Sequence, residues 1–212
     1  MAAKQSILNR IQAEKVVAIV RLNDAQRVAP TIEALYAGGL SAIEVTMGTP
    51  QAIRFIEQYA EHSSIMMGVG SVTDAEAARI AVSAGAKFIV TPVTKASVIE
   101  VALLHEVPVF SGAFSPTEIL QAYEWGADVI KVFPADVLGM SYFTSIKAPM
   151  PFLPLMPTGG VTLDNAAEWL KAGAWALGVG STLTNQKAIA QGNYSQITEN
   201  ARRLRESIAV SQ

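Results

Sequence analysis

One lysine lies in the middle of an apolar segment that is typical of a buried strand. The segment reads DVIKVFPA from Asp128 to Ala135, and Lys131 is its only basic residue. Lysine is seldom fully buried, and an isolated ammonium group in apolar surroundings tends to lose its proton. The neutral amine is a nucleophile that can attack a carbonyl group and form a Schiff base. The alternative is a lysine that extends from the strand edge to water, and this segment alone does not decide between them.

Glu44 is the second charged residue in a segment that otherwise resembles a buried strand. It lies between Ile43 and Val45, where burial of a carboxylate is costly unless the group is paired or hydrogen-bonded. Lys131 would be a suitable partner across a barrel. A carboxylate beside a neutral amine also provides what imine chemistry requires, which is a base that moves protons and a nucleophile that holds the carbonyl. A purely structural ion pair between Glu44 and Lys131 is the alternative.

Two glycine-containing segments follow consecutive predicted strands in the last third of the chain. One reads PTGGV from Pro157 to Val161, and the other reads GVGS from Gly178 to Ser181. Parallel barrels frequently bind phosphate in the loops after strands seven and eight, where glycine leaves backbone N–H groups uncovered. One Gly-Gly pair is most often a turn, but two such loops in adjacent units predict a phosphate site.

A similar segment, GVGS from Gly68 to Ser71, follows the third predicted strand. The Ser71 hydroxyl could bind a substrate carboxylate or water. The alternative is a tight turn in which Ser71 caps the helix that begins near Asp74.

The elements that must position these residues alternate regularly along the chain. Apolar segments of strand length are followed by segments of helical length at intervals of roughly two dozen residues. Eight such units indicate an α/β fold with a closed parallel (β/α)8 TIM barrel, rather than an open doubly wound sheet. The predicted strands are 16–21, 42–46, 65–69, 88–91, 108–110, 128–133, 152–156 and 174–178, and the predicted helices are 2–14, 24–38, 50–61, 74–84, 95–105, 116–125, 139–147, 164–171 and 184–207.

The chain contains no linker, low-complexity segment or break in composition, so we expect a single domain over residues 1–212, with the first helix preceding the barrel. The active site of such a barrel lies at the C-terminal ends of its strands. Lys87 precedes its strand and belongs to the opposite end. The polar residues that we expect at the mouth are Arg21, Glu44, Thr46, Ser71, Thr91, Ser111, Lys131, Thr158 and Ser181.

The composition excludes several classes of function. Half of the residues are hydrophobic, 16% are charged and the net charge is −2, which argues against a nucleic-acid partner. The chain has no cysteine, and His62 and His105 fall at helix ends away from the mouth, so we expect no metal and no thiol chemistry. No apolar segment is long enough for a membrane span, and the N-terminus lacks the apolar core of a signal peptide. A cytoplasmic location is therefore expected.

The segments named above, taken together, resemble a known family. The chain is similar to the class I aldolases that cleave 2-keto-3-deoxy-6-phosphogluconate (KDPG) and 4-hydroxy-2-oxoglutarate (KHG), over about residues 7–183. The segments that carry the resemblance are IEVT (43–46), GVGS (68–71), FIVTP (88–92), GAFSPTE (112–118), IKVFPA (130–135) and PTGGV (157–161).

The resemblance implies a role for each candidate residue. Lys131 would form the Schiff base and Glu44 would be the general acid and base. It implies a homotrimer that acts on a small, phosphorylated 2-oxo acid and needs no cofactor. Arg21 and Ser71 would bind the substrate carboxylate, Thr91, Pro92 and Phe133 would shape the pocket, and Thr158, Gly159, Gly160, Gly180 and Ser181 would bind the phosphate.

Three residues depart from the family pattern. Gly48 stands where many members have arginine, Ser71 where threonine is usual, and Val93 where glycine is usual. The first change removes a cation that would help to hold a carboxylate or a distal hydroxyl group, so it bears on substrate preference and not on the lysine chemistry. The alternatives are a phosphosugar isomerase or decarboxylase on the same barrel, and a non-catalytic protein that binds a phosphorylated metabolite.

Overall fold

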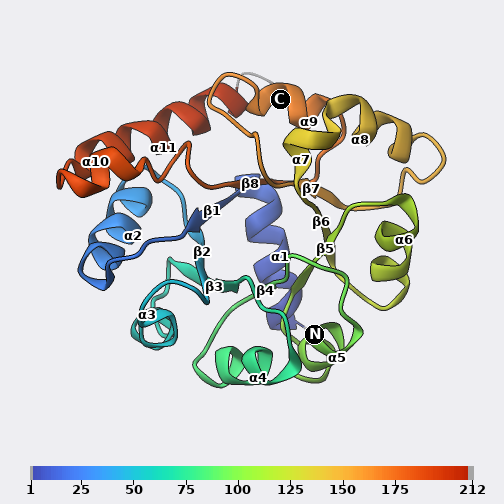
Figure 1. Ribbon diagram of the computed structural model, residues 1–212, viewed down its shortest axis with the longest axis horizontal. Coiled ribbons are helices and arrows are strands. Elements are labelled where there is room, and N and C mark those ends of the chain that lie inside the picture. The colour runs from blue at the N-terminus through green and yellow to red at the C-terminus, as the bar shows by residue number, and fades with distance from the viewer. Residues whose placement is uncertain (1, 210–212) are drawn as a thin grey trace.

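The computed structural model describes residues 2–209. Its strands form one parallel sheet of eight strands, with helices packed around the outside (Figure 1). The strands are β1 (Val16–Val20), β2 (Ala42–Thr46), β3 (Met66–Gly70), β4 (Ile89–Val90), β5 (Val109–Ala113), β6 (Val129–Val132), β7 (Leu155–Pro157) and β8 (Leu177–Val179).

Most helices follow the strands in the order expected of βα units. The 3-10 helix η1 (Ala25–Arg27) leads into α2, and the strand at β6 is followed by two short helices. The helices are α1 (Ala2–Glu14), α2 (Val28–Ala37), α3 (Ala52–Tyr59), α4 (Ala75–Ser83), α5 (Ala96–Leu104), α6 (Pro116–Glu124), α7 (Ala135–Leu138), α8 (Met140–Lys147), α9 (Ala166–Lys171), α10 (Gln186–Ala190) and α11 (Tyr194–Ala209).

The sheet closes into a barrel between β7 and β8. The continuous strand order runs from β7 through β6 down to β1 and then to β8. The Trp175 N–H donates to the Leu155 carbonyl at 2.7 Å, and Thr158 forms a parallel bridge with Gly178. This closure confirms the predicted (β/α)8 barrel and the helix that precedes it.

Side chains of alternate strand residues fill two separate apolar regions. Val17, Phe88, Phe110 and Met156 belong to a cluster inside the barrel, whereas Ile130 belongs to the larger cluster between the sheet and the helices. Because both faces of each strand are buried, the strands read as continuous apolar segments.

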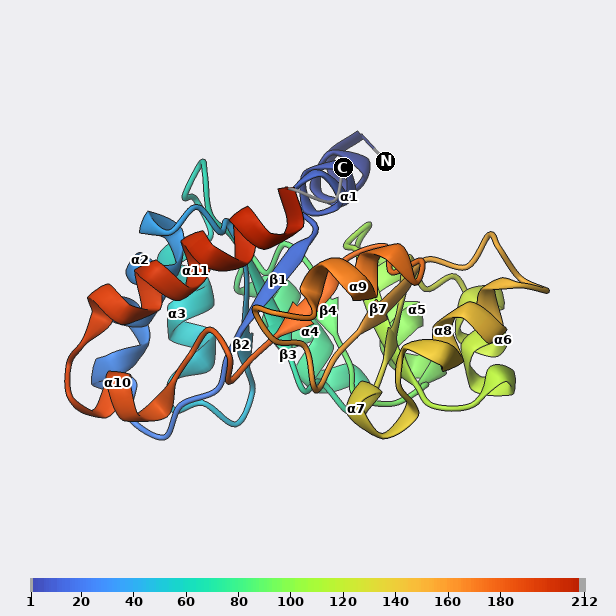
Figure 2. The same ribbon diagram turned by 90° about the horizontal axis from the view of Figure 1, so that it is seen from above.

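Helix α1 covers the N-terminal end of the barrel (Figure 2). Ile11 is fully buried in the inner cluster, and Ile7 and Leu8 pack against it. Lys4 forms an ion pair of 2.8 Å with Asp128. Helix α1 therefore fills the barrel at this end, and the opposite end, at the C-terminal ends of the strands, is the one at which a ligand can enter.

Two strands begin later in the chain than predicted. The prediction of 152–156 is wrong in its first part, because Pro154 precedes the strand and Phe152 is exposed, so β7 begins only at Leu155. The prediction of 174–178 begins too early. The Ala174 N–H is bonded to the Trp169 carbonyl at 3.1 Å as part of the end of α9, and β8 begins at Leu177.

One predicted helix is interrupted, and another is preceded by a short helix that the sequence analysis does not predict. A short helix, α7, precedes the helix predicted at 139–147, and Gly139 separates the two with a φ of 75°. The helix predicted at 184–207 consists of α10 and α11, which Gly192 separates with a φ of 69°. In both places a glycine takes a left-handed conformation that a helix does not contain.

Candidate active site

Lys131 points into the barrel from the middle of β6. It pairs in register with Gly112 of β5 and with Met156 of β7. Only 5% of the residue is exposed, so it does not extend to water from a strand edge. The amine nitrogen Nζ lies 5.1 Å from the centroid of the Phe133 ring, two residues further along the chain.

The surroundings of Lys131 favour the neutral amine. Burial lowers the pKa of Lys131 below its ordinary value, the Glu44 carboxylate opposes this shift, and the Arg21 charge lowers the pKa further. An amine with a depressed pKa is uncharged in a larger fraction of molecules near neutral pH, which is the form that attacks a carbonyl carbon.

Glu44 faces the same interior from β2 and is 1% exposed. Burial raises its pKa, while the charges of Lys131 and Arg21 oppose this shift. Its Oε2 atom is buried without a hydrogen-bond partner. Among the residues described, no direct ion pair joins Glu44 to Lys131, although each affects the pKa of the other. A structural ion pair therefore does not explain the presence of either residue.

Arg21 and Ser71 meet at the mouth. Arg21 follows β1 and donates a hydrogen bond of 3.2 Å from Nη2 to Ser71 Oγ. Ser71 follows β3 with a φ of 59°, a left-handed conformation that is uncommon for residues other than glycine. Ser71 does not cap helix α4, because the cap is Asp74, whose side chain accepts a hydrogen bond from the Ala77 N–H at 2.8 Å.

Thr91 and Pro92 lie on the other side of the mouth, and the hydroxyl of Thr91 is already used. Thr91 is fully buried, and its Oγ1 donates to the Val93 carbonyl at 3.0 Å. A Cβ atom on Gly112 would overlap with the Pro92 carbonyl, so this backbone packs directly against β5. Pro92 and Phe133 both line a second cavity of about 460 Å³. Thr91 thus shapes the wall and does not present its hydroxyl to the cavity described next.

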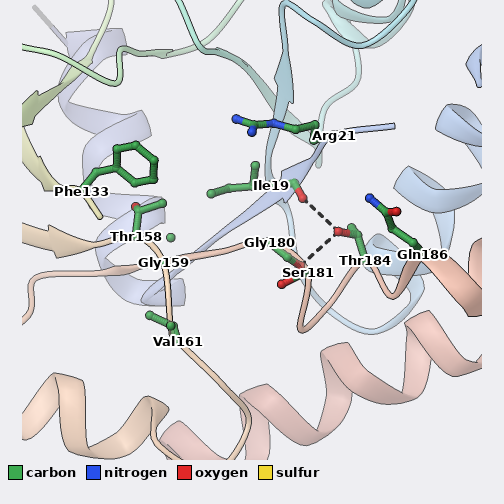
Figure 3. A pocket seen from close by; sticks show the side chains of 12 residues that line it. Ile19, Arg21, Phe133, Thr158, Gly159, Val161, Gly180, Ser181, Thr184 and Gln186 are labelled. Atoms are coloured by element: carbon green, nitrogen blue, oxygen red, sulfur yellow. Dashed lines mark hydrogen bonds between the residues drawn. The ribbon is translucent and has the colours of Figure 1, made fainter. Parts of the chain in front are cut away.

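The predicted phosphate loops line one cavity of about 270 Å³ (Figure 3). Gly159 and Gly160 have φ values of 97° and 73°, which require glycine. The hydroxyl of Thr158 is buried without a hydrogen-bond partner, so it is free to bind a ligand. The residues that line the cavity are Ile19, Arg21, Phe133, Thr158, Gly159, Gly160, Val161, Gly178, Gly180, Ser181, Thr184 and Gln186.

Phe133 links this cavity to Lys131. It lines both cavities, and its ring lies beside the Lys131 amine. Arg21 extends into the same space from β1 toward the side on which Phe133 lies (Figure 3). The structure therefore brings the predicted phosphate loops, the guanidinium group and the amine to one mouth.

Two polar residues of the cavity escape the sequence analysis. Thr184 and Gln186 lie in the segment predicted as a helix beginning at 184, but α10 begins only at Gln186. Thr184 Oγ1 donates to the Gly180 carbonyl at 3.1 Å and lies 3.4 Å from the Ile19 carbonyl. The available signal is Asn185, a residue type that favours helix N-caps and here accepts a hydrogen bond from the Ala188 N–H at 3.0 Å.

Ser111 is not part of the mouth, contrary to the prediction. It pairs with Ile130, whereas Gly112 pairs with Lys131. Residues that pair in register point to the same face, so Ser111 lies on the helix side of β5. Its hydroxyl is buried there without a hydrogen-bond partner.

Residues 2–209 contain no group of three or more His, Asp or Glu side chains arranged to hold a metal ion. In the same part of the chain, none of the helices has the length and apolar character needed to cross a bilayer.

Comparisons with known proteins give one family. The family model of KDPG and KHG aldolases matches residues 7–200. The chain is 34% identical over 197 residues to 2-dehydro-3-deoxy-phosphogluconate aldolase of Treponema pallidum, covering 91% of this chain and 93% of the relative. It is 34% identical over 171 residues to a protein of Rhizobium meliloti described as a probable 2-dehydro-3-deoxy-6-phosphogalactonate aldolase, covering 79% and 80% of the two chains.

A solved structure is similar over most of the chain. The KDPG aldolase of Legionella pneumophila, with pyruvate captured at low pH as a covalent carbinolamine intermediate, superposes with a TM-score of 0.85. The two proteins are 28% identical, and the superposition covers 92% of this chain and 95% of that one. The chain belongs to the KDPG and KHG aldolase family.

Proposed function

We propose that this protein is a Schiff-base aldolase that cleaves KDPG to pyruvate and glyceraldehyde 3-phosphate. The observation that carries this proposal is a buried lysine amine with a lowered pKa, 5.1 Å from the ring centroid of Phe133, a residue that lines the cavity of the two glycine loops. Cleavage of KHG to pyruvate and glyoxylate is proposed as a second activity, since the family unites both substrates.

In the first half of the reaction, the neutral Lys131 amine attacks the C2 ketone of the substrate. The hydroxyl group of the resulting carbinolamine takes a proton from solvent and leaves as water, which gives a protonated imine whose positive charge can accept an electron pair. Burial of Lys131 supports this step because it lowers the pKa of the amine and so increases the fraction of neutral amine before the attack.

In the second half, Glu44 takes the proton of the C4 hydroxyl group, through a water molecule. The C3–C4 bond then breaks, its electron pair neutralises the imine to an enamine, and the aldehyde leaves. Glu44 returns the proton to the enamine carbon, and hydrolysis of the new imine releases pyruvate and restores Lys131. The raised pKa of the Glu44 carboxyl supports both roles, because a carboxyl group that titrates nearer neutrality can both accept and donate a proton.

Each end of the substrate has a matching part of the mouth. The guanidinium group of Arg21, together with Ser71, is suited to the substrate carboxylate. The N–H groups of the loops at Gly159 and Gly180, with the free hydroxyl of Thr158, are suited to the phosphate.

The test is covalent trapping. The protein is incubated with pyruvate, reduced with borohydride, digested and mapped by mass spectrometry. We expect one reduced pyruvate adduct on Lys131 and none in a Lys131→Arg variant. An adduct on another lysine, or none at all, would contradict the proposal. Activity with KDPG that survives borohydride would instead indicate an isomerase or a decarboxylase without a covalent step, and binding without pyruvate release in a coupled lactate dehydrogenase assay would indicate a non-catalytic protein.

The preferred substrate requires a separate comparison. KDPG, its C4 epimer derived from galactonate, dephosphorylated KDPG and KHG are assayed for kcat/KM under the same conditions. We expect KDPG to be cleaved best and the dephosphorylated form to lose efficiency mainly in KM. A preference for the galactonate-derived epimer would leave the lysine chemistry unchanged and would assign the chain to the activity named for the Rhizobium meliloti relative.

We also propose a homotrimer in the cytoplasm. Val93, Phe114 and Phe133 are large apolar side chains that are 47%, 42% and 37% exposed around the second cavity, which supports burial against another copy of the chain. The trimer itself is the assembly that the family resemblance implies. Light scattering after size-exclusion chromatography tests it, and a monomer at micromolar concentration would contradict it.

A further inference from the structure

Gly70 is an inward-facing residue at the end of β3, next to the Glu44 carboxylate. It pairs in register with Thr46, and Gly68 pairs with Glu44 itself, so residue 70 lies one step nearer the mouth than residue 44. The Glu44 side chain leans in this direction and lies against Gly70.

A side chain on Gly70 would occupy the same space as Glu44. A Cβ atom there would overlap with Oε1 and Cδ of Glu44 and would lie 2.6 Å from its Cγ, and these are the three nearest atoms. The φ angle of Gly70 is outside the left-handed region, so the backbone itself would accept alanine. The three atoms nearest to such a Cβ atom all belong to Glu44, so glycine at this position makes room for the Glu44 side chain.

Gly68 gives a useful contrast on the same strand. A Cβ atom on Gly68 would overlap with the ring of Phe88 and would not approach Glu44 as closely as that ring. Two glycines of one strand thus make room for different neighbours, one for a packing residue and the other for the acid and base of the site.

The space at Gly70 also explains how Glu44 can be near Lys131 without pairing with it. Both side chains are buried and each influences the charge of the other, but the carboxylate rests against β3 and forms no direct ion pair with the amine. A direct pair would hold the proton on the lysine, and the amine would then be a poor nucleophile.

We propose that Gly70 is a positioning residue for the aldolase reaction, because the space it leaves holds the Glu44 carboxylate against β3, where it can exchange protons with the substrate. This inference rests on the proposed function. It makes residue 70 act through Glu44, without contact between Gly70 and the reacting atoms.

The test is a double-mutant cycle of Gly70→Ala and Glu44→Ala. Three quantities are measured, which are the thermal midpoint Tm, the borohydride trapping of pyruvate on Lys131, and the exchange of the pyruvate methyl protons in D2O by NMR. Trapping requires the lysine, whereas methyl exchange also requires a positioned acid and base. In the protein that keeps Glu44, we expect Gly70→Ala to lower the rate of methyl exchange by about 10²-fold relative to the trapping of pyruvate. We also expect it to lower Tm by at least about 2–4 °C.

In the Glu44→Ala background the same change at residue 70 should have almost no effect on either quantity, because no carboxylate remains to be displaced. Gly68→Ala is the matched control, and its loss of Tm should be equal in both backgrounds since its neighbour is Phe88. If Gly70→Ala does not fold but the double variant does, the proposed conflict with Glu44 is supported.

Three results would overturn the inference. They are normal exchange in Gly70→Ala, an equal effect of Gly70→Ala in both backgrounds, and a double variant that also fails to fold. Failure of the proposed function is a different result, because the unmodified protein would then show neither trapping nor methyl exchange with pyruvate.

Discussion

Arg21 Nη2 lies 3.2 Å from Ser71 Oγ, so that the end of β1 is joined to the end of β3 across the mouth of the barrel. We expect Arg21→Ala to raise KM for KDPG by roughly 10-fold or more, since a hydrogen bond to a charged group contributes about 1.5–3 kcal/mol. Ser71→Ala should have a smaller effect, because the guanidinium group remains. Steady-state kinetics of the two variants test this order, and equal effects would contradict it.

Glu44→Gln should separate imine formation from turnover. Glutamine keeps the shape of the side chain but cannot take a proton, and loss of such help lowers rates by about 10²–10⁴-fold. We expect kcat for KDPG to fall by this order while pyruvate is still trapped on Lys131. Lys131→Met serves as the control, because it should abolish both. Loss of trapping in Glu44→Gln at all pH values would assign Glu44 to carbinolamine formation instead.

The pH dependence of stability should differ in sign for the two buried groups. Burial raises the pKa of Glu44, so its contribution to stability is fully present below the ordinary glutamate pKa and is lost as pH rises through the raised value. Burial lowers the pKa of Lys131, so the folded chain holds this proton less tightly and stability rises as pH increases from the lowered value toward the ordinary one.

Urea denaturation from about pH 4 to about pH 10 tests both signs, with Glu44→Gln and Lys131→Met as references. The free energy of unfolding of the unmodified protein, relative to that of Glu44→Gln, should decrease as pH rises from the acid side. Relative to that of Lys131→Met, it should increase on the alkaline side. Parallel curves at all pH values would show that neither group titrates differently in the folded and unfolded chain.

Gly160→Ala should act on phosphorylated substrates alone. The φ of Gly160 is 73°, and a Cβ atom there would lie 2.7 Å from the Cβ of Asp136, so alanine must move the loop. We expect KM for KDPG to rise by about 10-fold or more, as for the loss of a hydrogen bond to a charged group. KHG, which carries no phosphate, is the internal control and should be cleaved as before. An equal loss with both substrates would place the effect of this loop on the lysine end of the site.

Ile11→Ala should cost stability without changing the chemistry. Ile11 is fully buried in the inner cluster at the end of the barrel opposite to the mouth. Truncation of a buried isoleucine typically costs about 2–5 kcal/mol. Chemical denaturation should show this loss, while kcat and KM of the folded enzyme stay the same at a temperature well below Tm. Altered kinetics would show that α1 influences the mouth.

The sequence predicts best those elements whose signal is local. The predicted strands 16–21 and 42–46 match β1 and β2 to within one residue, because strands buried on both faces read as mainly apolar segments. The same property does not reveal which face of a strand a side chain occupies, and for this reason the sequence predicts Ser111 at the mouth although it points to the helices.

Lys131 and Glu44 could be identified because a charged residue in a buried strand is itself exceptional. Thr184 could not, because its role depends on a contact with Ile19, which is 165 residues away in the sequence. The Arg21 and Ser71 contact likewise joins two loops that are 50 residues apart. Such relationships depend on barrel closure, which a single sequence predicts as a topology but not as a set of distances.

The position of α1 determines how molecules reach and leave the site. Ile7, Leu8 and Ile11 fill the end of the barrel opposite to the mouth, so the barrel is closed at that end. Substrate, water and both products must use one opening. In the proposed reaction, the aldehyde and pyruvate therefore leave the site by the same route that the substrate enters.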